Sequence, residues 1–172
     1  TDEESVRILR EIEADTEAPV PVQVIWQENR GVSAARNAGI RNTCSPLVLV
    51  LDGDDRLRPT YIEKVRRMLC ESSRMVAASS WMQTFGALNA AVCPCGGDVA
   101  AFLSRNCCPA THIMRRSAWE MCGGYDESMR SGFEDWEFFL SMLETEPDTS
   151  IGIVEEMLIE YRTAPVSSNI KS

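Results

Sequence analysis

A chain of 172 residues with 44% hydrophobic and 25% charged residues has the composition of a folded protein rather than of a disordered segment. Its formal net charge of −9 argues against nucleic acid and anionic membrane surfaces as partners, because both repel an acidic protein. No run approaches the roughly 20 apolar residues that a transmembrane helix requires, and the length favours one domain over residues 1–172.

The chain is expected to begin with a helix and a strand. Thr1 and Glu4 form a capping-box pattern that predicts a helix through about Ala14. Apolar residues recur along this helix every three to four positions, so one side should pack on a sheet. Residues 22–26 then have the pattern of a buried strand. The chain opens without a methionine or a signal-peptide pattern, as expected of a trimmed or processed front end.

A helix and an apolar strand come next. Residues 32–40 are helical in propensity and consist largely of small residues, which let a helix lie close to its neighbours. Residues 47–51 form a continuous apolar run, typical of a central parallel strand covered on both faces. This strand stops abruptly at the acidic turn Asp52-Gly53-Asp54-Asp55.

The rest of the chain alternates strands and helices, which favours an α/β layered fold. The sequence predicts a helix from Pro59 to about Cys70, a strand at 75–81, an irregular loop at 82–98, a strand at 110–115, a helix at 117–122, a sharp turn at Gly123-Gly124, a helix opening at 134–136, and two late strands at 151–154 and 157–162.

The acidic turn is a candidate metal site. Three carboxylates within four residues repel one another unless a cation neutralises them, and carboxylate oxygens are the ligands that magnesium and manganese prefer. Ligands of open α/β sheets bind beyond the carboxyl ends of the strands, where this turn is expected. A solvated turn with helix-capping aspartates is the alternative.

The seven cysteines are scattered and odd in number, which favours reduced thiols and a cytoplasmic location. A structural zinc site is an alternative, with ligands drawn from Cys93, Cys95, Cys107, Cys108 and His112. The C-x-C and C-C spacings differ from the usual C-x2-C pairs. His112, the single histidine, is expected to be a structural residue of the core or of a strand.

Four motifs in order resemble the inverting family 2 glycosyltransferases, which have the GT-A fold. They are NRGVSAARNAG at 29–39, the apolar strand ending in DGDD at 47–55, MRR at 114–116 leading to GGYDE at 123–127, and EDW at 134–136. The resemblance extends from about Val22 to Arg162. It implies a Rossmann-like, mostly parallel sheet flanked by helices, with a nucleotide and metal side at about 1–81 and an acceptor side at about 82–165.

The resemblance also implies roles for single residues. Asp52 would approach the nucleotide, and Asp54 would bind the divalent cation, Mg or Mn, that bridges the diphosphate of a nucleotide-sugar donor. Arg36 would lie near the nucleotide pocket; a salt-bridging arginine is the alternative. Asp135 would be the general base that takes the proton of the acceptor hydroxyl, with its proton affinity raised by the adjacent Glu134; a helix cap is the alternative.

The match departs from the family pattern at the front. Family members begin with a strand, a helix and a second strand ending in an aspartate motif, and this sequence matches from the residues after that motif. We therefore expect an N-terminally incomplete fold that is poorly stable alone, oligomeric, or part of a larger enzyme.

The sequence therefore predicts a metal-assisted, inverting glycosyltransferase that uses a nucleotide-sugar, such as a UDP-sugar, and a glycan, lipid or protein acceptor. It would be cytoplasmic and could associate peripherally with a membrane. A truncated, non-catalytic relative is the alternative. A magnesium-dependent nucleotidyl or phosphoryl transferase is disfavoured, because the chain has no glycine-rich phosphate loop.

Overall fold

The computed structural model describes residues 3–164. Contacts divide the chain into two compact units, Thr1–Arg30 and Gly31–Ser172. The single-domain organisation expected from the sequence stays a prediction. No helix that the structure describes is long and apolar enough to cross a bilayer.

The first unit contains helix α1 (Glu3–Ala14), which confirms the predicted helix. None of its residues is buried within this unit, and the expected packing of its apolar side on a sheet stays a prediction. The predicted strand at 22–26 is wrong: this segment has no regular structure, and Trp26 is 49% exposed. A strand requires a hydrogen-bonded neighbour, and no described strand pairs with these residues. Trp26 Nε1 donates instead to the carboxylate of Glu13, at 3.3 Å.

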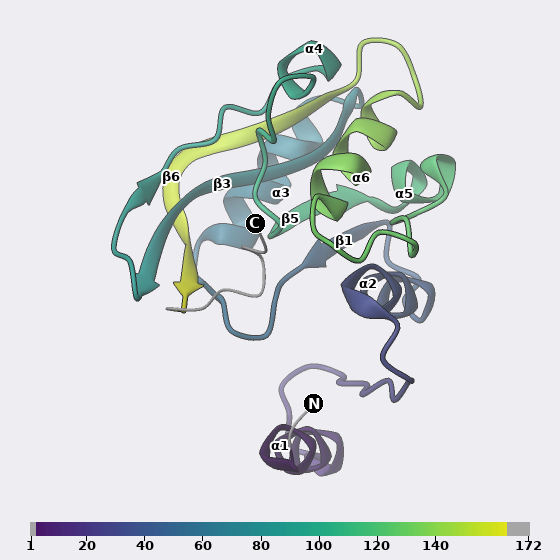
Figure 1. Ribbon diagram of the computed structural model, residues 1–172, viewed down its shortest axis with the longest axis vertical. Coiled ribbons are helices and arrows are strands. Elements are labelled where there is room, and N and C mark those ends of the chain that lie inside the picture. Colours follow the sequence, from purple (N-terminus) through teal and green to yellow (C-terminus); the bar gives the residue numbers. More distant parts are fainter. Residues whose placement is uncertain (1–2, 165–172) are drawn as a thin grey trace. The chain divides into compact units, whose positions relative to one another are not determined.

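The second unit is built on one mixed sheet (Figure 1). Its strands are β1 (Leu47–Val50), β2 (Arg56–Leu57), β3 (Met75–Gly86), β4 (Ala91–Val92), β5 (His112–Arg115) and β6 (Ser150–Thr163). They lie in the order β1-β5-β3-β6-β2, with β4 paired to β3 outside this path.

The pairing corrects the expected parallel sheet. Only β3 and β6 pair in parallel among the described strands; the other pairs are antiparallel. The α/β class is confirmed, but the sheet is mixed rather than mostly parallel. Strand β1 is at the edge and antiparallel to β5, not central and parallel. An apolar run indicates burial, but it does not identify the neighbouring strand.

Two further boundaries differ from the predictions. The segment at 82–98 is not simply a loop, because β3 continues to Gly86 and pairs with β4. The two predicted late strands are one strand, β6. Its register against β3 shifts where Ser80 faces Val154 and Trp81 faces Met157, so Glu155 and Glu156 form a bulge. This polar pair interrupts the apolar pattern without ending the strand.

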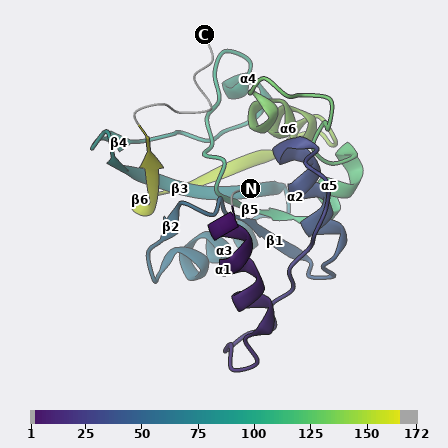
Figure 2. The same ribbon diagram turned by 60° about the horizontal axis from the view of Figure 1, so that its bottom comes forward.

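Helices cover both faces of the sheet (Figures 1 and 2). Helix α3 (Tyr61–Glu71) packs on one face, where Tyr61, Val65 and Leu69 join strand residues such as Ala78. The opposite face is covered by α2 (Gly31–Arg41), α4 (Val99–Phe102), α5 (Arg116–Cys122) and α6 (Glu134–Leu143). Neighbouring residues enter opposite cores, Ala77 and Ala78 in β3 and Met114 and Ile113 in β5, as the strand period requires.

Candidate active site

A cleft of about 630 Å³ lies within the second unit. Its walls come from α2, the acidic turn, β3, β4, the segment before β5, the start of α6 and the end of β6. The residues that line it include Val32, Arg36, Asp52, Asp54, Met82, Pro94, Asn106, Cys108, Glu134, Asp135, Tyr161 and Arg162. All four site residues predicted from the sequence are among them.

The acidic turn places its three carboxylates in different environments. Asp52 accepts a hydrogen bond from Arg36, at 3.1 Å. Asp54 is exposed at the cleft. Asp55 is buried, and its Oδ1 accepts the backbone N–H of Arg162 at 2.9 Å. Burial raises the pKa of Asp55 to about 6, although this hydrogen bond lowers it. Asp55 therefore ties the turn to β6, a structural role that the sequence motif did not reveal.

Arg36 connects the two ends of the candidate site. Its side chain is 8% exposed; Nη1 lies 2.6 Å from Asp135 Oδ1, and Nη2 lies 3.1 Å from Asp52 Oδ1. The guanidinium carbon is 5.3 Å from the ring centroid of Tyr125, a distance suited to a cation–π contact. Burial opposes the positive charge, but Asp135 and Asp52 raise the pKa of Arg36 above its usual value. Arg36 is a salt-bridging arginine inside the cleft.

Asp135 lies in an environment that raises its affinity for a proton. It lies in the first turn of α6, and its side chain is 18% exposed. Burial raises its pKa to about 6, against the lowering effect of Arg36, while Glu134 and Asp52 raise it further. Burial, rather than the adjacent Glu134, is thus the main cause. A carboxylate with a pKa near neutrality can both hold and release a proton at working pH.

A buried amide, missed by the sequence reasoning, fixes α2 against the GGYDE loop. Asn37 is 1% exposed. Its Oδ1 accepts from the Trp119 indole and from the backbone N–H of Tyr125, both at 3.0 Å. Its Nδ2 donates to the carbonyl of Tyr125 at 2.9 Å. This clamp holds the helix that carries Arg36 beside the loop that carries Tyr125. In the sequence, the sign of this clamp was one amide side chain, Asn37, among the small residues of α2.

In the part of the chain that the structure describes, His112 and the cysteines do not form the zinc site considered from the sequence. The structure confirms His112 as a buried strand residue whose Nδ1 contacts the carbonyl of Ala110 at 2.7 Å. Burial lowers its pKa to about 4. Between residues 3 and 164, no three His, Cys, Asp or Glu side chains are grouped as a metal site. The zinc alternative therefore has no supporting geometry in the described residues.

The carboxylates at the cleft nevertheless fit a divalent cation that a diphosphate also binds. Magnesium is usually held by one or two carboxylates together with substrate phosphates and water. Asp54 is exposed at the cleft, and Asp52 lies two residues before it. Since Arg36 engages Asp52, Asp54 is the candidate ligand of the two. Two carboxylates alone would not surround a cation completely, so this pair suits a cation that the substrate also coordinates.

Replacing Arg36 should raise the pKa of Asp135. Arg36→Met removes the cation that lowers the pKa of Asp135, and an adjacent arginine typically lowers such a pKa by about 1 to 3 units. We expect the Asp135 midpoint to rise by about one pH unit or more. Carbon-13 NMR titration of the side-chain carboxyls measures it. Arg41→Met is the matched control, because Arg41 lies on the same helix but pairs with Glu127. An unchanged midpoint in Arg36→Met would contradict the coupling.

Comparison with known proteins adds a family match and a fold match. The family model described as "Glycosyl transferase family 2" matches residues 1–92. The uncharacterized glycosyltransferase YwdF of Bacillus subtilis (strain 168) is 25% identical over 130 residues, which cover 70% of this chain and 48% of that protein. Glycosyltransferase GlyA of Streptococcus pneumoniae serotype 4 is 35% identical over 57 residues, covering 33% of this chain and 8% of GlyA.

The solved structures show the same fold. TarS 1-349 of S. aureus, in complex with UDP-GlcNAc, superposes with a TM-score of 0.73 at 11% identity, covering 100% of this chain and 50% of that one. Its complex with UDP gives a TM-score of 0.69 at 14% identity, over 96% of this chain and 49% of that one. The chain thus spans about half the length of TarS 1-349 and of YwdF. At such identities, the superposition supports the GT-A-like fold and not a shared substrate.

Proposed function

The chain belongs to glycosyl transferase family 2, and we propose that its cleft transfers a sugar from a nucleotide-sugar to an acceptor hydroxyl with inversion. The observation that carries the proposal is the chain of contacts Asp52–Arg36–Asp135. Asp135, a half-buried carboxylate of raised pKa, lines the same cleft as the exposed carboxylate of Asp54. Sugar transfer needs both kinds of carboxylate close together: one accepts the hydroxyl proton, and the other binds a cation beside the diphosphate.

Asp135 is the proposed general base. A hydroxyl is a weak nucleophile until a positioned base begins to remove its proton. Asp135 accepts that proton, and the oxygen attacks the anomeric carbon from the side opposite the leaving diphosphate. One displacement from the opposite side inverts the configuration at that carbon. Arg36 keeps Asp135 ionised and oriented before the acceptor arrives.

The donor side of the cleft is the proposed site of a UDP-sugar. One of the superposed TarS structures is a complex with UDP-GlcNAc, and this supports a donor of that class here. Asp52 would face the nucleotide, and Asp54 would hold the divalent cation, magnesium or manganese. Such a cation, when bound, stabilises the negative charge that develops on the departing diphosphate. Arg36 supplies positive charge between the donor and base sides.

Metal-dependent nucleotide binding tests this proposal. We expect calorimetric titration of UDP into the chain to show binding with manganese and at least about tenfold weaker binding without it. Asp54→Ala should remove the manganese dependence. Glu63→Ala is the matched control, since Glu63 is an exposed carboxylate on α3 that does not line the cleft. Circular dichroism verifies that both variants fold.

Either outcome of this titration distinguishes the two possible roles of the chain. Binding that depends on Asp54 supports a donor site made by these residues. A folded chain that binds neither UDP nor another nucleotide diphosphate, with or without manganese, would support the non-catalytic alternative. The acceptor class, a cytoplasmic location, association with a membrane surface and self-association stay predictions.

A further inference from the structure

Two cysteines outside the proposed catalytic contacts lie together. Cys95 follows β4, and Cys107 follows α4. The backbone N–H of Gly96 donates to the carbonyl of Cys107 at 3.0 Å, so the two segments run beside one another. Both thiols also contact Arg105: the Cys107 thiol lies 3.7 Å from its carbonyl oxygen, and its guanidinium lies against Cys95. The fold therefore forms a thiol pair from residues in two different loops.

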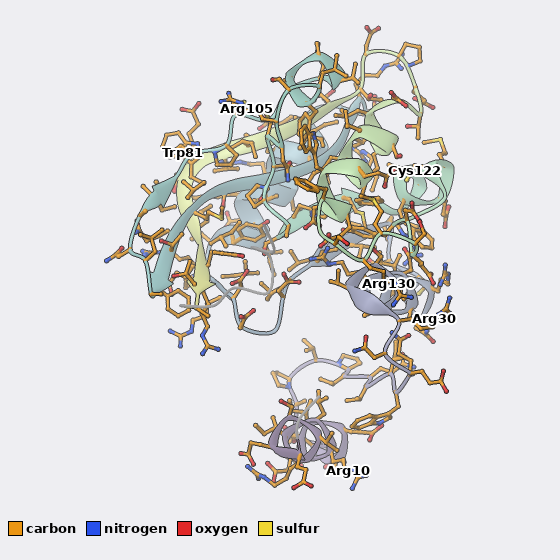
Figure 3. All side chains as sticks on the ribbon, in the orientation of Figure 1. Arg10, Arg30, Trp81, Arg105, Cys122 and Arg130 are labelled. Atoms are coloured by element: carbon orange, nitrogen blue, oxygen red, sulfur yellow. The ribbon has the colours of Figure 1, made fainter. Side chains whose placement is uncertain are left out.

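The two thiols differ in access and in charge environment. Cys95 is exposed, whereas Cys107 is 2% exposed. Nη2 of Arg105, which Figure 3 labels, lies 3.6 Å from Cys95 Sγ. Contacts with Cys107 and Arg105 lower the pKa of Cys95, whereas burial raises that of Cys107. An exposed thiol of lowered pKa is the more reactive nucleophile, so Cys95 is the attacking thiol and Cys107 the resolving one.

Backbone contacts hold this pair in place. Gly97 exchanges two hydrogen bonds with Ile151 of β6, both at 2.9 Å. The Cys107 thiol donates to the carbonyl of Ala101 at 3.4 Å, which ties it to α4. Because both segments are anchored, the backbones that carry the two cysteines are held beside one another without a rearrangement of the sheet.

We propose that Cys95 and Cys107 form a redox modification site that a low-molecular-weight disulfide converts to an intramolecular disulfide bond. With glutathione disulfide, the Cys95 thiolate attacks one sulfur, the glutathione S–S bond breaks, and one glutathione leaves as a thiolate. Cys107 then loses its proton to solvent and attacks the Cys95 sulfur, which releases the second glutathione. The two protein thiols are oxidised by two electrons, and glutathione disulfide is reduced to two thiols.

This bond would connect two walls of the cleft. Pro94 lies beside Cys95, Asn106 lies beside Cys107, and both line the cleft. Oxidation would join the two segments next to that opening. The proposal does not depend on what the cleft binds, because it rests on the thiol pair and on Arg105.

Mass spectrometry after oxidation tests the proposal. The chain is incubated with glutathione disulfide at pH 7, its remaining thiols are alkylated, and its peptides are mapped. We expect the loss of two hydrogen atoms, a peptide that joins Cys95 to Cys107, and reversal by dithiothreitol. Cys95→Ser should abolish the linkage, while Cys93→Ser, an exposed cysteine two residues away, should leave it intact. Arg105→Gln should slow the reaction several-fold.

Three results would overturn the proposal. One is a stable glutathione adduct on Cys95 that never resolves onto Cys107. Another is a linkage that joins a different pair of cysteines. The third is a linkage that persists in Cys95→Ser. Because Cys95 is exposed, its replacement should leave the circular dichroism spectrum unchanged, so loss of the linkage reports the chemistry rather than unfolding.

Discussion

Asp135→Asn should nearly abolish sugar transfer by lowering the turnover rate roughly 10²- to 10⁴-fold, the usual contribution of a general base. The substituted amide keeps the shape of the carboxyl group but cannot accept the hydroxyl proton. Donor binding should be nearly unchanged, because Asp52 and Asp54 remain in place. Sugar transfer by the purified variant and calorimetric UDP binding measure the two effects separately.

The pH dependence of transfer provides an independent check on the same residue. Burial raises the pKa of Asp135 to about 6, so the ionised base is lost as pH falls through that value. We expect transfer by the wild-type enzyme to decline below about pH 6.

The raised pKa of Asp135 makes its contribution to the free energy of unfolding depend on pH. The folded state holds the Asp135 proton more tightly than the unfolded state, for which the ordinary value is 3.8. Ionised Asp135 therefore disfavours folding above about pH 6, and this penalty fades as pH falls toward 3.8. For the same reason, the neutral amide in Asp135→Asn should allow the chain to fold.

A matched control lies at the far end of the same helix. Glu144 is exposed at the C-terminal end of α6, so Glu144→Gln should retain wild-type transfer. Full turnover by Asp135→Asn would show that another group takes the hydroxyl proton. A loss of transfer in both variants would point to the helix rather than to the base.

Gly124→Ala should destabilise the fold far more than Gly123→Ala. Both glycines have positive φ angles, 84° for Gly124 and 85° for Gly123, so alanine at either position costs about 1–2 kcal/mol of backbone strain. A Cβ at Gly123 meets nothing within 4 Å, whereas at Gly124 it would lie 2.8 Å from Asn37 Oδ1 and 2.9 Å from Trp119 Nε1.

The clash at Gly124 falls on the buried clamp. Moving Asn37 would break its hydrogen bonds to Trp119 and to the Tyr125 backbone, and each buried polar group left unpaired costs about 1–3 kcal/mol. We expect Gly124→Ala to lose roughly 3 kcal/mol or more in free energy of unfolding. Urea unfolding of the two variants, followed by circular dichroism, measures the difference. Equal losses would mean that the Asn37 clamp shifts without cost.

The sequence by itself determined the local elements of this protein. The small-residue helix at 31–41, the helix after Pro59 and the turn at Gly123-Gly124 all appear where their patterns predicted them. These features depend on interactions within a few residues: backbone propensity, apolar spacing and the freedom of glycine at positive φ. The family motifs also located the candidate site residues, because such motifs keep their order along the chain.

Only the tertiary structure decided which of these residues meet. Arg36 pairs with Asp135 across 99 positions of sequence, and the acidic turn directs Asp55 inward to β6 while leaving Asp54 exposed. The edge position of β1 and its antiparallel pairing were likewise missed. Apolar patterns indicate which residues favour burial, whereas strand neighbours, ion-pair partners and the burial actually reached depend on how distant segments are brought together. That information lies in the packing of the whole unit.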